Sequence, residues 1–320
     1  MTRAGMLPSL PVSLFGSVMG LSGLTLGWRL AHVNFGAPKW IATIVALLAV
    51  LDFIVLLVAY TFKCWRYWPQ VVDEFRHPVS GNFFGTFPIA VLLISVVLRP
   101  LGLGMSETLW IIGTLLTLAM AYWSVTGFFA QARSLDHATP AWIIPGVGVL
   151  DIPVTSAGLP WGAIPQIDRL GFAIGAVWAL ILIVLIIGRH VVRGPVAPPL
   201  VPSLAILFAP FPVAFLGYET GLAGPRPDDF AATLFYFGLF LFLGLVPHLA
   251  RRGLPFGPSW WALSFPMAAM ANSALIYSRL TPGWGLAALA TALLIGVTLA
   301  IGWILVKSLA HPFWTVGRAQ

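Results

Sequence analysis

The stretch WWALSFPMAAMANSALIY, from Trp260 to Tyr277, decides the class of this protein because it carries no charged side chain over its whole length. A helix needs about 20 mostly apolar residues to cross the hydrocarbon core of a bilayer. A proline, Pro266, nevertheless lies near its centre, directly after the bulky Phe265. A proline inside a helix removes one backbone hydrogen bond and displaces the carbonyl four residues earlier. An unpaired carbonyl is costly in lipid, so we expect this helix to face protein or a water-filled cavity.

The composition of the whole chain also indicates an integral membrane protein. The 320 residues are 59% hydrophobic and only 8% charged, whereas a soluble domain has about 25% charged residues. The net charge of +7 does not indicate nucleic-acid binding, because the basic residues lie in short clusters near the ends of apolar segments. That distribution is typical of membrane topology.

Ten segments of the sequence are long and apolar enough to be membrane-spanning helices, and short connections join them. They cover about 10–31, 39–62, 82–99, 106–131, 140–159, 168–188, 200–219, 228–250, 259–279 and 283–308. The sequence therefore predicts an all-α integral membrane protein, with ten transmembrane helices in a single membrane domain over residues 1–320.

Prolines divide these segments into two alternating classes. The odd-numbered segments from the third onward carry interior prolines: Pro88, Pro145 and Pro153, Pro210 and Pro212, and Pro266. The first has Pro11 near its start, followed by Gly16, Gly20 and Gly23, while the even-numbered segments have no proline near their centres. The alternation predicts five helical hairpins, with bent odd helices around a central pore and regular even helices against lipid. The alternative is that the bent helices pack together without a channel.

The distribution of Lys and Arg predicts the orientation. With the N-terminus in the cytoplasm, the inside segments hold eleven basic residues, which are Arg3, Lys63, Arg66, Arg76, Arg133, Arg189, Arg193, Arg251, Arg252, Lys307 and Arg318. The outside loops hold six, which are Arg29, Lys39, Arg99, Arg169, Arg226 and Arg279. We therefore expect a multi-pass protein of the plasma membrane, the inner membrane in a bacterium, with both termini cytoplasmic.

Three stretches resemble one known family. WWALSFPMAAMANSA (260–274), VVDEFRHPVSGNFFGTFPIA (71–90) and SLFGSVMGLSGL (13–24) are similar to the ninth-helix segment, the loop and third helix, and the first helix of that family. It is the TehA-like tellurite-resistance and dicarboxylate transporter family, which includes the plant slow-type anion channels. The similarity covers about 10–310, in the order and spacing of the ten segments.

The resemblance implies a ten-helix fold of five hairpins, in which the odd helices line a pore, and a homotrimer with one pore per subunit. It implies that Phe265 plugs the closed pore and that Gly16 lines it. The spacing of Gly16 and Gly20 is also typical of close helix contact. The partners implied are membrane lipids and small inorganic or organic anions, because family members are assigned chloride, nitrate, malate, sulfite or tellurite.

An aromatic ring at the narrowest point excludes water and offers an ion no ligand, so it blocks conduction without binding anything. Pro266 weakens the helix next to Phe265, and small residues leave room for the ring to move. No Lys or Arg falls in the middle of any segment. We therefore expect basic residues at the pore mouths and weak polar groups along the pore to favour anions, because tight binding sites slow conduction.

Two carboxylates lie inside predicted spans, where ionisable groups are rare and are functional candidates. Asp151, in the fifth segment, would oppose an anion when charged but not when protonated, so it is a possible proton-linked group. The alternative for Asp151 is a structural pair with a neighbouring helix or an Arg. For Asp52, in the second segment, we expect structural pairing. Asp151 motivates a second hypothesis, a proton-linked transporter of C4-dicarboxylates or oxyanions such as tellurite or sulfite.

The sequence contains no pattern of an enzyme. Metal-ligand spacings, a phosphate-binding glycine loop and a nucleophile elbow are missing from it. Cys64 is the single cysteine, and the histidines lie near segment ends, where they are misplaced for haem. We expect no enzymatic activity, no cofactor and no metal. A membrane-embedded enzyme or redox subunit is the third and weakest hypothesis.

Overall fold

The computed structural model describes residues 7–130, 132–223, 228–249 and 253–310, and all regular secondary structure in these ranges is helical. The α-helices are α1 (Phe15–Phe35), α2 (Lys39–Arg66), α3 (Trp68–Arg76), α4 (Thr86–Leu98), α5 (Leu103–Ala130), α6 (Ile143–Val147), α7 (Asp151–Ser156), α8 (Ile164–Arg193), α9 (Pro210–Gly221), α10 (Asp229–Leu249), α11 (Trp261–Leu280) and α12 (Trp284–Ala310). Short 3₁₀ helices precede or join them: η2 (Val12–Leu14), η3 (Ser80–Gly85), η4 (Arg99–Leu101), η5 (Leu135–His137), η6 (Pro140–Trp142), η7 (Gly148–Leu150), η8 (Pro198–Leu207) and η9 (Pro258–Trp260).

Seven helical stretches among the described residues are long and apolar enough to cross a membrane. They are α2, Ser80–Leu101, α5, α8, Pro198–Gly221, α10 and α12, and each coincides with a predicted segment. The other three predicted segments correspond to α1, to the broken series from η6 to α7, and to α11. Glycine, serine and asparagine make α1 and α11 less apolar, which is possible because protein rather than lipid surrounds them.

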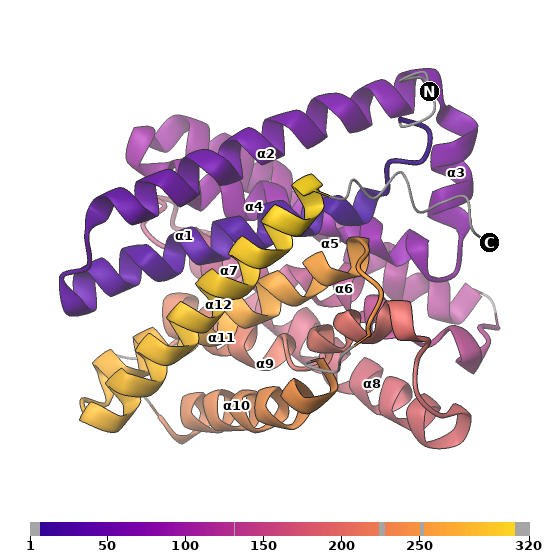
Figure 1. Cartoon of the computed structure of the whole chain (residues 1–320). Coiled ribbons are helices and arrows are strands. Elements are labelled where there is room, and N and C mark those ends of the chain that lie inside the picture. The colour runs from indigo at the N-terminus through magenta and orange to yellow at the C-terminus, as the bar shows by residue number, and fades with distance from the viewer. Residues whose placement is uncertain (1–6, 131, 224–227, 250–252, 311–320) are drawn as a thin grey trace.

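Burial separates inner from outer helices. In Ser80–Leu101 and Pro198–Gly221, 72% of the most apolar window is buried, whereas in α2, α5, α8, α10 and α12 the share is 22–33%. Most residues of α1 and α11 are buried as well. In Figure 1, α2 borders the bundle at the top and α10 at the bottom, with α9 and α11 between them. The expected arrangement of odd segments inside and even segments outside is therefore present.

The prolines act differently from the prediction. Pro210 is the first residue of α9, and Pro88 and Pro145 are the third residues of α4 and α6. They do not bend a continuous α-helix; they lie in the first turn after a 3₁₀ segment, where backbone N–H groups have no partner in the same helix. Pro266, by contrast, is inside α11 as predicted.

Close contact between α1 and α11 depends on three glycines, and a Cβ atom on one of them, Gly27, would lie 2.6 Å from Asn272 Oδ1. A Cβ atom on Gly23 would lie 2.8 Å from the Cβ of Ala268, and one on Gly20 would collide with Ser264. The Asn272 side chain donates from Nδ2 to the Gly23 carbonyl at 3.0 Å. A Cβ on Gly16 would meet its nearest atom at 3.6 Å, an ordinary contact. Helix packing therefore requires Gly20, Gly23 and Gly27 but not Gly16.

A buried ion pair holds the chain just before α1. Lys63 Nζ lies 2.5 Å from Glu74 Oε2 and donates to the Leu10 carbonyl at 2.7 Å. Glu74 Oε1 accepts the Val12 N–H at 2.7 Å. Because Lys63 is only 2% exposed, this pair links α2 and α3 to the segment that leads into the bundle.

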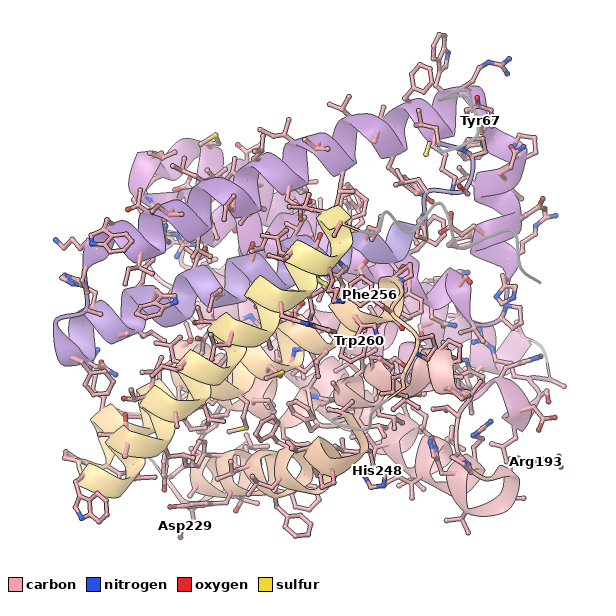
Figure 2. The ribbon with its side chains drawn as sticks, viewed as in Figure 1. Tyr67, Arg193, Asp229, His248, Phe256 and Trp260 are labelled. Atoms are coloured by element: carbon pink, nitrogen blue, oxygen red, sulfur yellow. The ribbon has the colours of Figure 1, made fainter. Side chains whose placement is uncertain are left out.

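The two ends of the bundle can be followed in Figure 2, where Tyr67 and Arg193 lie at one end and Asp229 at the other. The C-terminal ends of α2 and α8 therefore share one side of the bundle. Several basic residues used to predict the orientation lie outside the described residues: Arg3, Arg226, Arg251, Arg252 and Arg318.

Candidate functional site

A small cavity of about 70 Å³ lies among the inner segments. Each of the five predicted odd segments contributes to its wall, for example through Met19, Ile89, Val147, Ile206 and Ala262. No described residue of α2, α5, α8, α10 or α12 lines it. The inner helices thus surround one common space, as a pore in the middle of the bundle would require.

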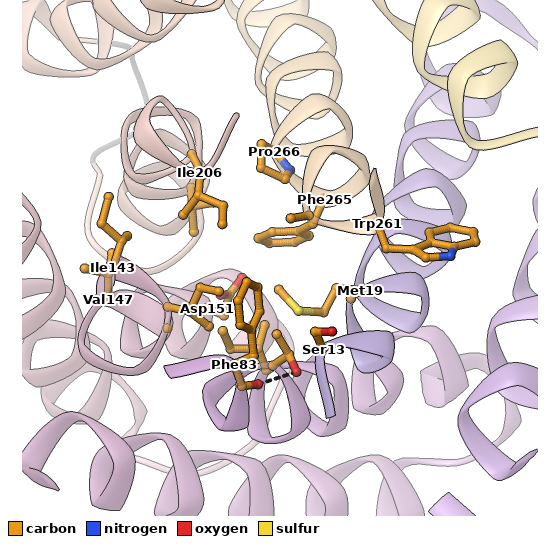
Figure 3. A pocket seen from close by; sticks show the side chains of 18 of the residues that line it. Ser13, Met19, Phe83, Ile143, Val147, Asp151, Ile206, Trp261, Phe265 and Pro266 are labelled. Atoms are coloured by element: carbon orange, nitrogen blue, oxygen red, sulfur yellow. Dashed lines mark hydrogen bonds between the residues drawn. The ribbon is translucent and has the colours of Figure 1, made fainter. Parts of the chain in front are cut away.

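Two phenylalanines enter this space from opposite sides. Figure 3 shows the Phe265 side chain extending from α11 and the Phe83 side chain from η3, with Met19 beside them. Thr86 Oγ1 donates to the Phe83 carbonyl at 2.6 Å and holds the turn that carries the ring. The part of the cavity between these two rings is therefore aromatic and apolar.

The indole ring of Trp261, one turn before Phe265, extends away from the Phe265 ring (Figure 3), although Trp261 also lines the cavity. Its Nε1 donates to Ser308 Oγ on α12 at 3.1 Å, while Ser264 Oγ donates to the Gly16 carbonyl at 3.3 Å. These two bonds fix the start of α11 against α12 and α1. Phe265 therefore directly follows a helical turn that these two bonds hold in place, which we call the anchored turn.

Pro266 interrupts the backbone hydrogen bonding of α11. It has no N–H, so the Ala262 carbonyl lacks the donor that a regular helix would supply. Ala262, Phe265 and Pro266 all line the cavity. We predicted from the sequence that the Ala262 carbonyl faces protein or a cavity rather than lipid, and the position of Ala262 in the cavity wall agrees with that prediction.

Asp151 is the only charged residue in the wall of the cavity among the described residues. It is 2% exposed, and its Oδ1 has no hydrogen-bond partner. The described residues include no Lys, Arg or His within ion-pair distance of it. The structural pairing considered as the alternative for Asp151 is therefore not found within the described ranges, where the cavity wall contains no cation.

The structure brings together five of the predicted site residues, which are Gly16, Asp151, Pro210, Phe265 and Pro266. It does not bring Pro88 or Pro145 into that wall. Pro88 lines a separate cavity with Leu57 and Met120, between α4, α2 and α5.

Pro145 lies against the backbone of η3, where a Cβ on Gly85 would be 2.8 Å from the Pro145 Cα. Asp52 lies outside the central cavity and accepts a hydrogen bond from Ser17 Oγ at 2.5 Å, which is the structural pairing expected for it.

Sequence reasoning missed Phe83, although it lies in the quoted segment 71–90, between two glycines in GNFFG. It also expected basic residues to stay available at the pore mouths. Arg29 instead donates to the Val96 and Val97 carbonyls at 3.0 and 2.6 Å.

Arg99 donates to the Thr155 carbonyl at 2.5 Å and to the Ala157 carbonyl. Arg29 and Arg99 therefore satisfy the terminal carbonyls of α4 and α7, where a cation is favourable.

The sequence of this chain is similar to those of known anion channels and of a tellurite resistance protein. Residues 9–309 match the family SLAC1, described as voltage-dependent anion channel. The chain is 27% identical over 273 residues to the tellurite resistance protein TehA homolog of Haemophilus influenzae, covering 84% of this chain and 81% of that protein. It is 27% identical over 316 residues to the S-type anion channel SLAH2 of Arabidopsis thaliana, covering 95% of this chain and 59% of that protein. The guard cell S-type anion channel SLAC1 of the same plant is 24% identical over 316 residues, with 95% and 56% covered.

Proposed function

The chain belongs to the SLAC1 family of voltage-dependent anion channels, which are membrane proteins and not enzymes, and we propose that it conducts small inorganic or organic anions through a pore closed by Phe265. The observation that carries this proposal is the cavity itself: all five inner segments line it, and the Phe265 and Phe83 side chains enter it. An ion that reaches this point must lose water without gaining a ligand, which costs several kcal/mol. The ring thus acts as a barrier rather than as a binding site.

Opening requires a movement of the Phe265 side chain or of the helix that carries it. The missing hydrogen bond at Pro266 makes α11 easier to deform there, and Ala268 and Ala269 add little bulk after it. The anchored turn before Phe265 stays in place through the bonds of Trp261 and Ser264. We propose that gating is a local change around Phe265 rather than a rearrangement of the whole bundle.

Selectivity in this proposal comes from weak interactions. The cavity wall offers the hydroxyl group of Ser13 as a weak donor, but its described residues include no Lys or Arg. Weak sites permit fast passage, and the cost of dehydration then orders the anions. Strong preference for a single small monovalent anion in bilayer recordings would contradict this mechanism.

The alternative function is proton-linked transport of a dicarboxylate or an oxyanion. The specific observation in its favour is Asp151, a carboxyl group in the cavity wall with one oxygen unpaired and no cation beside it. Its charged form would repel an anion and its protonated form would not. Saturable malate uptake that requires a proton gradient, and that Asp151→Asn abolishes, would support this alternative over the channel.

We also propose the finer topology: ten spans in five hairpins within one membrane domain, both termini cytoplasmic, in the plasma membrane. Its support is that α1, the series from η6 to α7, and α11 lie among the buried inner helices. Labelling of single cysteines introduced at the ends of α2 and α10 from either side of the membrane tests the orientation. Native mass spectrometry tests the homotrimer.

The experiment that tests the function is electrical recording of the purified protein in lipid bilayers, with chloride, nitrate and malate as the only anions in turn. A current carried by anions, enlarged by the Phe265→Ala substitution, supports the channel. A folded protein that carries no current in either form would contradict it.

A further inference from the structure

A further cavity, of about 670 Å³, lies apart from the two cavities described above, between the end of α3, η3, the end of α5 and the loop before α6. We call it the basic pocket. Arg76, His77, Arg133 and His137 line it, and no Asp or Glu is among its described lining residues. The Lys and Arg distribution predicts that it opens to the cytoplasm.

Arg133 is a cation that forms no ion pair with any residue in the described part of the chain. It is half-buried, and its guanidinium lies 4.5 Å from the centre of the Phe128 ring and 5.8 Å from that of Trp142. The nearest acidic residue along the chain, Asp136, is 3.0 Å from Arg193 and is already paired. A partly desolvated charge that the chain leaves unpaired favours an anion from outside.

Local hydrogen bonds orient the other donors. His77 Nδ1 accepts the N–H groups of Val79 and Ser80 at 3.2 and 3.1 Å. A neutral imidazole whose Nδ1 accepts carries its hydrogen on Nε2, so His77 keeps one donor for a ligand. Arg76 is exposed and forms no ion pair among the described residues.

The basic pocket shares two walls with the pore cavity. Asn82 lines the basic pocket, and the next residue, Phe83, lines the pore cavity. Likewise Trp142 lines the basic pocket and Ile143 the pore cavity. A ligand that moves or fixes η3 or η6 therefore acts directly on the segments that hold Phe83 and the pore wall.

We propose that the basic pocket binds a phosphate monoester with an organic group, and that its occupancy changes the anion current through the neighbouring pore. Two guanidinium groups match phosphate oxygens with paired, charge-assisted hydrogen bonds, which a halide does not use. The Phe75 and Trp123 rings, 4.9 Å apart, give the wall an apolar side for the organic group. The binding claim stands on this geometry alone, whereas the effect on current rests on the proposed channel function.

Binding is measured first, on the full-length protein in phosphatidylcholine nanodiscs, with glycerol 3-phosphate as the soluble probe. The same protein in nanodiscs that contain 10% phosphatidic acid presents the same phosphate chemistry as a lipid headgroup. Saturable binding of glycerol 3-phosphate identifies a free organic phosphate as sufficient. A rise in Tm in the nanodiscs with phosphatidic acid, without binding of glycerol 3-phosphate, identifies a lipid headgroup as the phosphate that the pocket binds. Binding of neither probe overturns the proposal.

The variant Arg76→Gln is the main test, because Arg76 is exposed and its loss leaves the fold intact. We expect about a tenfold or greater loss of affinity, as for one charge-assisted contact. Arg133→Lys keeps the positive charge but loses the paired N–H donors of the guanidinium, and we expect it to weaken binding as well. Arg66→Gln, at an exposed arginine that ends α2 and lies outside the pocket, is the matched control and should bind like the wild type. Equal affinity in Arg76→Gln and wild type would overturn the site.

Current is measured second, with and without the bound probe. We expect the probe to change the current of the wild type and of Arg66→Gln, but not that of Arg76→Gln. Binding without any change in a measurable current overturns the regulatory part. If the protein carries no current at all, the proposed function fails, while the binding results still decide the site.

Discussion

Replacement of Phe265 by alanine is the sharpest perturbation of the proposed pore. The phenyl ring occupies roughly 100 Å³, the space of about three water molecules at about 30 Å³ each. Without it, water and a partly hydrated anion can pass the point where the ring lies in Figure 3. The side chain is only half-buried, so we expect the variant to lose less than the roughly 3–5 kcal/mol typical of a fully buried phenylalanine.

The magnitude follows from the cost of dehydration at an apolar neck. That cost is several kcal/mol for an ion in a real protein. If the ring accounts for about 3 kcal/mol of it, the anion current rises about a hundredfold, since each 1.36 kcal/mol changes a rate tenfold. Phe83 still occupies the opposite wall, so the double variant Phe265→Ala/Phe83→Ala should conduct more than either single variant.

The assay is the chloride current of purified protein in planar bilayers, normalised to the amount of reconstituted protein. Phe240→Ala is the matched control, because Phe240 is 69% exposed on the outer helix α10. We expect its current to equal that of the wild type. Currents of Phe265→Ala that match those of Phe240→Ala, in a protein with an unchanged Tm, would refute the role of the ring as a barrier.

Three further predictions concern the cavity and the packing around it. Gly20→Ala forces α1 away from α11 and should lower the free energy of unfolding by about 1–3 kcal/mol. Gly16→Ala, which has room for a Cβ, should fold normally but reduce the current. Equal losses of stability in the two variants would contradict the different roles assigned to Gly20 and Gly16. Asp151→Asn removes a carboxyl group from the cavity wall, so any dependence of the current on pH that this group causes should disappear. A pH profile identical to that of the wild type would exclude Asp151 as its source. Lys63→Met leaves the Glu74 carboxylate without its ion-pair partner and should destabilise the protein by about 3–5 kcal/mol. The loss is measured as a lower Tm in detergent. An unchanged Tm would show that the ion pair does not hold the segment before α1.

The family resemblance and the alternation of prolines together anticipated much of the site. Phe265 was identified through the resemblance to the TehA-like family, and Pro266 through its place near the centre of an uncharged span. Phe83 was not identified, because nothing in GNFFG indicates which of its two aromatic residues faces the cavity. That choice depends on the phase of η3, which Thr86 fixes through its bond to the Phe83 carbonyl.

The sequence by itself determined the membrane class, the positions of the apolar segments and their division into inner and outer sets, because lipid imposes length, hydropathy and backbone pairing on each segment separately. Only the tertiary structure decided what the individual groups do. Pro88, Pro145 and Pro210 begin helices instead of bending them, and Arg29 and Arg99 bond to helix ends instead of standing free at a pore mouth. These outcomes depend on which backbone atoms other segments bring within a few ångströms, and the spacing of residues along one chain does not contain that information.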